Sequence, residues 1–139
     1  MYISHLVLDD EMKALVKEYG TGIESIDFSI SDNLDRLSDS IKAYREKMRY
    51  IGTRRLILHG PFLDVNPCAY DSLVREVTMT RFNQCYEAGL HLGAKKIVFH
   101  SGMNPYVYYK RILGGAGCQI LAGIYEEQNR NRNSSRKCV

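Results

Sequence analysis

Short apolar runs alternate with longer amphipathic stretches through residues 1–110. The short runs predict β-strands, and the stretches between them, in which apolar residues recur every three or four positions, predict helices. The expected strands cover residues 2–8, 23–30, 55–59 and 96–100, and the expected helices cover residues 12–19, 34–48 and 72–92. Strands and helices that alternate in this order favour parallel strands joined by helical crossovers. We therefore expect an α/β protein with about four βα units.

Two local signals bound the longest expected helix. Asp71 stands directly before the helical pattern and can accept hydrogen bonds from the first free amide groups. Gly93 stands directly after the pattern, where a left-handed residue commonly ends a helix. We expect the helix to run from residue 72 to residue 92.

The pattern is lost after residue 110. Residues 111–139 contain a glycine-rich apolar stretch and then a polar run of Asn, Arg and Ser, which is typical of disorder. We expect the βα units to occupy residues 1–110 and an aberrant or disordered tail to occupy residues 111–139. One hypothesis is that the tail is a frameshift product, since one extra base at the Lys110 codon would hide a further helix and strand.

Charge and cysteine usage exclude some classes of protein. The net charge is +3, but residues 1–110 hold 14 basic and 14 acidic side chains, so the excess lies in the tail. This distribution argues against a nucleic-acid partner. The cysteines at positions 68, 85, 118 and 138 form no CxxC pair, and the sequence shows no signal-peptide pattern or apolar run of membrane-spanning length. We expect a cytoplasmic protein without a membrane partner.

Two histidines stand at the ends of neighbouring expected strands. His59 is followed by Gly60-Pro61, and His100 is followed by Ser101-Gly102. The two histidines lie 41 positions apart, about the length of one βα unit with a long loop. Because the carboxyl ends of parallel strands share one rim, we expect the two imidazoles to lie close together. They could bind a divalent metal, or they could be hydrogen-bonded histidines without a metal.

The two histidine turns and the helix between them resemble a known superfamily. The stretch LILHGPFLDVNP, followed by REVTMTRFNQCYEAGLHLGAKKIVFHSG, is similar to the third and fourth βα units of the xylose-isomerase-like TIM barrels. That superfamily includes sugar and sugar-phosphate isomerases and epimerases and endonuclease IV. The resemblance implies that the chain is the N-terminal half, about four βα units, of a (β/α)8 barrel, since a full barrel needs about 250 residues.

The resemblance also implies a chemistry. His59 and His100 would be metal ligands for Mn, Zn, Mg or Co, and the substrate would be a small sugar or sugar phosphate. The metal would assist proton transfer next to a carbonyl group. Further ligands and the catalytic carboxylates would come from later strands, so we expect this chain alone to be inactive. Two alternatives stay open: an abasic-site phosphodiesterase like endonuclease IV, and a non-catalytic half-barrel that associates with itself through open sheet edges.

A few other polar residues are weaker candidates. Asp64 and Asn66, in the loop after His59, could contact substrate, although an Asx turn is the commoner role. His5 is a further substrate-binding candidate if it points inward near the rim. Glu24 could face the same rim or could be an ordinary charged residue of a strand edge.

Overall fold

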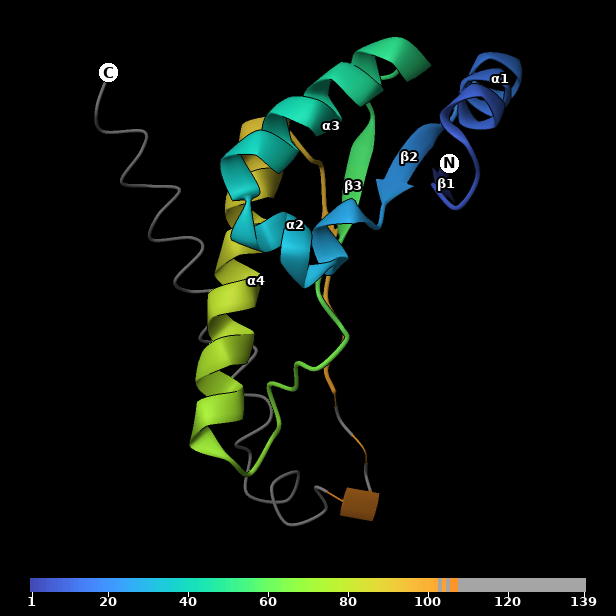
Figure 1. The fold of residues 1–139 in the computed structure, drawn as a ribbon. Helices are drawn as coiled ribbons and strands as arrows, with labels where there is room; N and C mark the ends of the chain where they lie inside the picture. Colours follow the sequence, from blue (N-terminus) through green and yellow to red (C-terminus); the bar gives the residue numbers. More distant parts are fainter. Residues whose placement is uncertain (103, 105, 108–139) are drawn as a thin grey trace, which may run out of the picture.

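The chain forms a mixed α/β fold with a four-stranded parallel sheet (Figure 1). The structure is a computed structural model that describes residues 1–102, 104, 106 and 107, so the expected tail at 111–139 lies outside the described residues. The strands lie side by side in chain order, β1-β2-β3-β4. In sequence order the elements are β1 (Tyr2–Ser4), α1 (Asp9–Tyr19), β2 (Gly22–Ser25), the 3-10 helix η1 (Asp27–Ser29), α2 (Ser31–Asp35), α3 (Leu37–Ile51), β3 (Leu56–His59), α4 (Ser72–Leu92) and β4 (Ile97–Val98).

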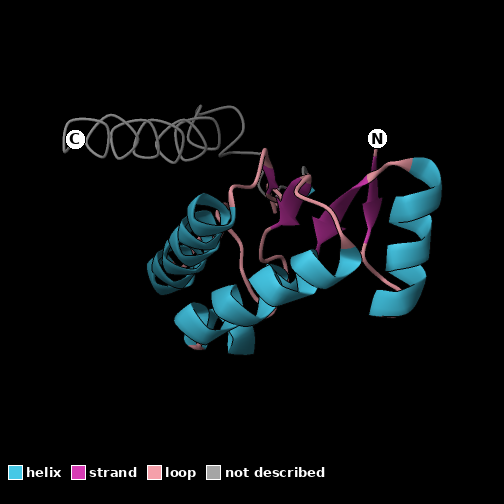
Figure 2. Cartoon of the chain, turned by 90° about the horizontal axis from the view of Figure 1, so that it is seen from above, coloured by secondary structure: helices cyan, strands magenta, loops and turns pink. Residues whose placement is uncertain are grey.

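The helices within residues 1–102 cover one face of the sheet. Seen from above, α1, α3 and α4 lie around the outer side of the curved strands (Figure 2). On β3 the fully buried side chains of Leu56 and Leu58 belong to the main hydrophobic cluster under α3 and α4. Successive strand residues point to opposite faces, so Ile57 and His59 project from the other face, which we call the open face.

The main core lies between β3, α3 and α4. It contains Phe28, Leu34 and nearby side chains of both long helices, and the rings of Phe28 and Tyr44 make an edge-to-face contact at a centroid distance of 5.5 Å. A smaller cluster under α1 joins Met12, Val16, Ile23 and Ile51. The β3–β4 half of the sheet therefore has the larger buried support, and it is this half that carries the two histidines.

Helix α4 begins and ends where the sequence predicts. The Asp71 carboxylate accepts hydrogen bonds from the amide groups of Leu73 at 2.8 Å and Val74 at 3.4 Å. At the other end Gly93 has a φ of 69°, and its amide donates back to the last turn. The helix leads directly into β4, because the Lys95 amide donates to the Leu56 carbonyl on β3 at 2.8 Å.

Three strands are clearly shorter than the sequence predicts, and the first of them, expected at residues 2–8, ends at Ser4. The strand expected at residues 23–30 ends at Ser25, whose hydroxyl accepts the amide of Asp27 at 3.2 Å and turns the chain into η1. The alternating pattern continues beyond this point because Phe28 is buried within the turn. Strand β4 ends at Val98, so His100 lies two residues beyond it.

One negative finding concerns membranes. Among the helices within residues 1–102, none is long and apolar enough to cross a bilayer.

Candidate functional site

The two histidines meet at the carboxyl-terminal end of the sheet. His59 is the last residue of β3, and the last β3–β4 hydrogen bond joins the Gly60 amide to the Val98 carbonyl at 2.8 Å, just before His100. The Nε2 atoms of His59 and His100 lie 3.1 Å apart. The expectation that the two imidazoles share one rim agrees with this geometry, although only His59 lies within a strand.

Phe62 packs against both imidazoles. Its ring stacks on His100 at a centroid distance of 5.4 Å and an interplanar angle of 28°. It meets the ring of His59 edge to face, at 5.1 Å and 73°. Such ring contacts restrict how far each imidazole can rotate. The end of β3 therefore supplies a histidine, and the turn after it supplies the aromatic side chain that packs against the pair.

The hydrogen bond at Nδ1 of His59 determines its tautomer. Nδ1 lies 3.0 Å from the Gly60 carbonyl oxygen, which can only accept a hydrogen bond. Nδ1 therefore carries the proton, and in the neutral imidazole the lone pair lies on Nε2, the atom that faces His100. A backbone carbonyl on one ring nitrogen is a common way of presenting the other nitrogen to a metal.

The distance between the two Nε2 atoms suits a shared metal ion. Two Zn–N bonds of about 2.0–2.1 Å at a tetrahedral angle hold their nitrogen atoms about 3.3 Å apart. The observed 3.1 Å is close to this separation, and without a metal the same atoms can share one hydrogen bond. Within the described part of the chain no group of three or more His, Cys, Asp or Glu side chains could hold a metal. The two histidines alone are therefore fewer than the three or four protein ligands that a zinc site uses.

Asn66 organises the loop between β3 and α4. Its side-chain oxygen accepts the amide of Cys68 at 2.8 Å, which is the Asx turn considered for this position. The backbone amide of Asn66 donates to the hydroxyl of Thr78 on α4 at 2.8 Å. The loop also reaches the turn after His100, since the Cys68 thiol lies 3.4 Å from the Ser101 carbonyl oxygen. These contacts join the two histidine turns and give Asn66 a structural role near the pair.

Asp64 lies on the surface of the same loop. Its φ of 56° is a left-handed conformation, which Asp tolerates better than most residues. It lines a pocket of about 280 Å³ together with Ile30, Leu63 and Val77. A turn role accounts for these features, and no hydrogen bond between Asp64 and either histidine is seen in the described residues.

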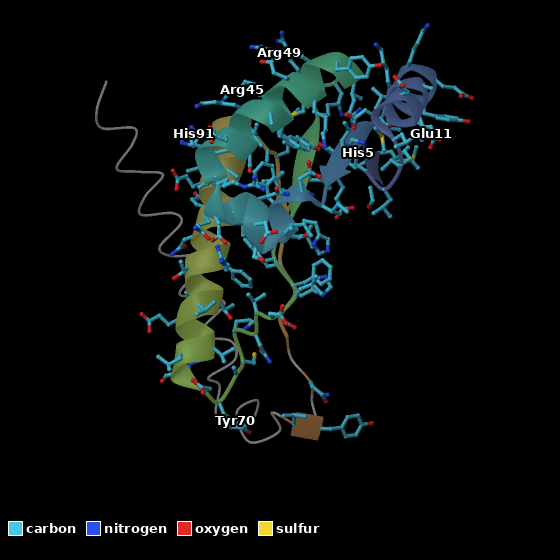
Figure 3. All side chains as sticks on the ribbon, viewed as in Figure 1. His5, Glu11, Arg45, Arg49, Tyr70 and His91 are labelled. Atoms are coloured by element: carbon cyan, nitrogen blue, oxygen red, sulfur yellow. The ribbon has the colours of Figure 1, made fainter. Side chains whose placement is uncertain are left out.

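His5 lies on the helix-covered side of the sheet, beside α1 and β2 (Figure 3). Its side chain is 4% exposed, and its Nε2 is 3.2 Å from the Asp9 carboxylate. Ile3 packs into the cluster under α1, and a residue two positions later continues on the same side. The structure therefore does not bring His5 to the histidine pair.

Glu24 projects from the open face. Its strand neighbours Ile23 and Ser25 are fully buried on the helix side, so Glu24 points the other way. Its carboxylate accepts a hydrogen bond from the Ser4 hydroxyl on β1 at 2.6 Å. The sequence left its direction open, and the contact of Phe62 with the histidines was not predicted at all. The burial of residues 23 and 25 is the signal that separates the two orientations of Glu24.

The site thus defines a class: an α/β protein whose parallel sheet carries an imidazole pair at its carboxyl-terminal end. No family model and no curated protein matches the chain. Among solved structures, the chain is similar to the TTHB071 protein from Thermus thermophilus, in a crystal soaked with ZnCl2, with a TM-score of 0.67 and 20% sequence identity. The match covers 94% of this chain and 51% of the Thermus chain. The chain therefore spans about half the length of that protein, and at this identity the likeness shows the fold alone.

Proposed function

We propose that residues 1–110 form half of a (β/α)8 barrel and that His59 and His100 are two ligands of a divalent metal ion at its rim. The observation that carries the proposal is the 3.1 Å separation of the two Nε2 atoms at the carboxyl ends of adjacent parallel strands. In barrels of this type the loops at that end form the active site.

The architecture supports the half-barrel part of the proposal. In the part of the chain that the structure describes, four parallel strands follow one another in chain order, and the helices lie on one face. A (β/α)8 barrel contains twice this number of strands, with its helices on the outside and side chains filling the inside. The match covers 51% of the Thermus chain, which agrees with a half of a longer fold.

The reaction class is that of a sugar or sugar-phosphate isomerase or epimerase. A metal ion held by the histidines would polarise a substrate carbonyl and hydroxyl and would ease removal of a neighbouring proton. His59 and His100 would hold the ion, and Phe62 would restrict both rings. The Ser4–Glu24 pair on the open face would offer hydrogen-bonding groups to substrate hydroxyls. Because the described residues supply only two ligands, we propose that the single chain binds metal weakly and does not turn over substrate.

Zinc binding measured by isothermal titration calorimetry tests the ligand assignment. We expect His59→Ala and His100→Ala each to weaken zinc binding by about tenfold or more, because each removes one of two imidazole ligands. The matched control is His91→Ala, which removes an exposed histidine from the end of α4 and should leave the affinity unchanged. Equal zinc affinity in the wild type and the two site variants would rule out the proposed site.

A further inference from the structure

A second pocket lies at the end of the sheet opposite the two histidines. It has a volume of about 660 Å³ and lies between the last turns of α3 and α4, just before the chain enters β3 and β4. Ligand pockets in proteins commonly measure about 300–1,000 Å³, so this one is large enough for a small organic molecule. The candidate metal ligands are at the carboxyl-terminal end of the strands, so the two sites are separate.

The residues that line this pocket are basic and not acidic. Arg45 and Arg49 lie on the outer side of α3 (Figure 3), and Arg54 stands in the connection to β3. None of the lining residues is an aspartate or a glutamate. The pocket beside η1 and α2 differs, since Asp27 and Asp39 lie there among the basic residues. The pocket between α3 and α4 is therefore the better match for an anion.

The two helix ends account for only part of this charge. The C-terminal end of a helix carries about half a negative charge, and both α3 and α4 end at the pocket. Arg45 donates to the His91 carbonyl in the last turn of α4 at 3.0 Å, and Arg49 pairs with Glu46. Arg54 makes no hydrogen bond or ion pair with any of the described residues. Each guanidinium group has five N–H donors, so the described residues use few of the donors at this pocket.

The deeper part of the pocket is apolar. Met48 is 8% exposed and belongs to the main hydrophobic cluster, and Leu92 packs against the same cluster. Gly52 and Gly93 end the two helices, and an added Cβ at either position would meet nothing within 4 Å. A ligand can therefore approach the backbone closely at both glycines. A ligand that fits this pocket combines an anionic part with a flat apolar part.

We propose that this pocket binds a nucleotide. The guanidinium groups of Arg49 and Arg54 bind the phosphate, because the planar fork of arginine matches two phosphate oxygens. The base packs against Met48 and Leu92, since a thioether makes favourable contacts with aromatic rings. A sugar phosphate lacks the ring and a nucleoside lacks the anion, so each matches only half of the pocket. The proposal rests neither on metal binding nor on the half-barrel.

Isothermal titration calorimetry of the full chain with AMP tests the proposal. EDTA removes metal from the solution, and about 0.15 M KCl screens exposed charges. We expect AMP to bind at one site. Ribose 5-phosphate, which lacks the base, and adenosine, which lacks the phosphate, should each bind at least about tenfold more weakly. Absence of AMP binding would overturn the proposal, and so would equal affinities for AMP and ribose 5-phosphate.

Arg54→Gln and Arg55→Gln form a matched pair of variants. Both arginines are exposed and adjacent in the chain, but Arg55 donates to the Gly20 carbonyl at 2.9 Å, lies over the Tyr2 ring and does not line the pocket. Arg54→Gln should weaken AMP binding by about tenfold or more, whereas Arg55→Gln should leave it unchanged. Circular dichroism checks that both variants keep the helix content of the wild type. Equal affinities of the two variants for AMP would overturn the assignment of Arg54.

NMR spectra of the full chain show where AMP binds. AMP should shift the backbone amide signals of Gly52, Thr53 and Gly93, which line the pocket. A variant that combines His59→Ala with His100→Ala should bind AMP like the wild type. Shifts confined to the open face, or loss of AMP binding in the histidine variant, would overturn the proposal. A failed AMP titration leaves the zinc test unaffected, because that test concerns the other end of the sheet.

Discussion

The two faces of the sheet differ in what holds their side chains. On β3, Leu56 and Leu58 are fully buried under two helices, whereas Ile57 and His59 project from the open face and are only partly buried. Two of the four side chains of β3 therefore pack in the core, and the other two lie on the face that carries the candidate site. This separation means that the fold and the chemistry can be changed independently, and each prediction below tests that independence.

The largest effect is expected on the covered face. Leu58→Ala removes a fully buried side chain from the main cluster and should lower the free energy of unfolding by about 2–5 kcal/mol. The neighbouring change His59→Ala, on the open face, should cost less than about 1 kcal/mol. Urea unfolding followed by circular dichroism measures both. Similar losses in the two variants would show that the faces are not independent.

The thiol of Cys85 reports on the integrity of the covered face. Burial raises the pKa of this thiol from its ordinary value of 9.0 to about 12. At pH 8 we expect iodoacetamide to modify Cys85 at least about a hundredfold more slowly in the folded chain than in urea, because only the thiolate reacts and the site is covered. Mass spectrometry of the peptide that contains Cys85 gives the rate. Equal rates in the two conditions would contradict the packing of α4.

The same raised pKa predicts how stability changes at high pH. The folded state keeps the thiol protonated while the unfolded state loses the proton above about pH 9. The contribution of Cys85 to stability is therefore complete below pH 9 and is lost as the pH rises towards about 12. Cys85→Ala should remove this part of the pH dependence.

A smaller effect is expected at the start of α4, where the loop that follows β3 enters the helix. Asp71→Ala removes the carboxylate that accepts two amide groups at the start of α4 and should cost about 1 kcal/mol. Asp71→Asn keeps a hydrogen-bond acceptor at the cap and should recover most of the loss. Thermal unfolding of the three proteins measures the difference, and equal midpoints for the wild type and Asp71→Ala would contradict the cap.

The smallest effect concerns Phe62 on the open face. Phe62→Ala leaves both imidazoles in place but removes the ring that packs against them, so zinc affinity should fall by about two- to tenfold with little change in stability. Phe62→Leu fills part of the space without stacking and should lie between the two. An unchanged zinc affinity in Phe62→Ala would show that the two imidazoles do not need the Phe62 ring to hold their orientation.

Some elements were predictable because their signals are local. The bounds of α4 follow from Asp71 and Gly93, each of which acts on its own turn of backbone. The end of β2 was not predictable, because the alternating apolar pattern continues through η1. There the Asn33 side chain donates to the Asp27 carbonyl at 2.8 Å and stabilises the turn. An alternating pattern fixes which side chains are buried, but not whether the backbone stays extended.

The candidate site likewise has features that the sequence predicts and features that it does not. The approach of His59 and His100 followed from the spacing of two strand ends, which depends only on the order of the elements. The direction of the His5 side chain did not follow from the spacing of the elements, because a shift of one position along a strand moves a side chain to the other face. The sequence does not show which residue of 2–8 is the first to pack on α1. The role of Phe62 depends on the path of a whole loop, which no short motif determines.

The most direct test of the account is an NMR titration with Zn²⁺ that follows the side-chain nitrogens of all four histidines. The account predicts that zinc shifts Nε2 of His59 and His100 together, at one stoichiometry, while His59 keeps its proton on Nδ1. His5, paired with Asp9, and His91, on the surface of α4, should not shift at that stoichiometry. Shifts at His91 or His5 with none at the pair, or shifts of His59 and His100 at different zinc concentrations, would contradict a shared metal site.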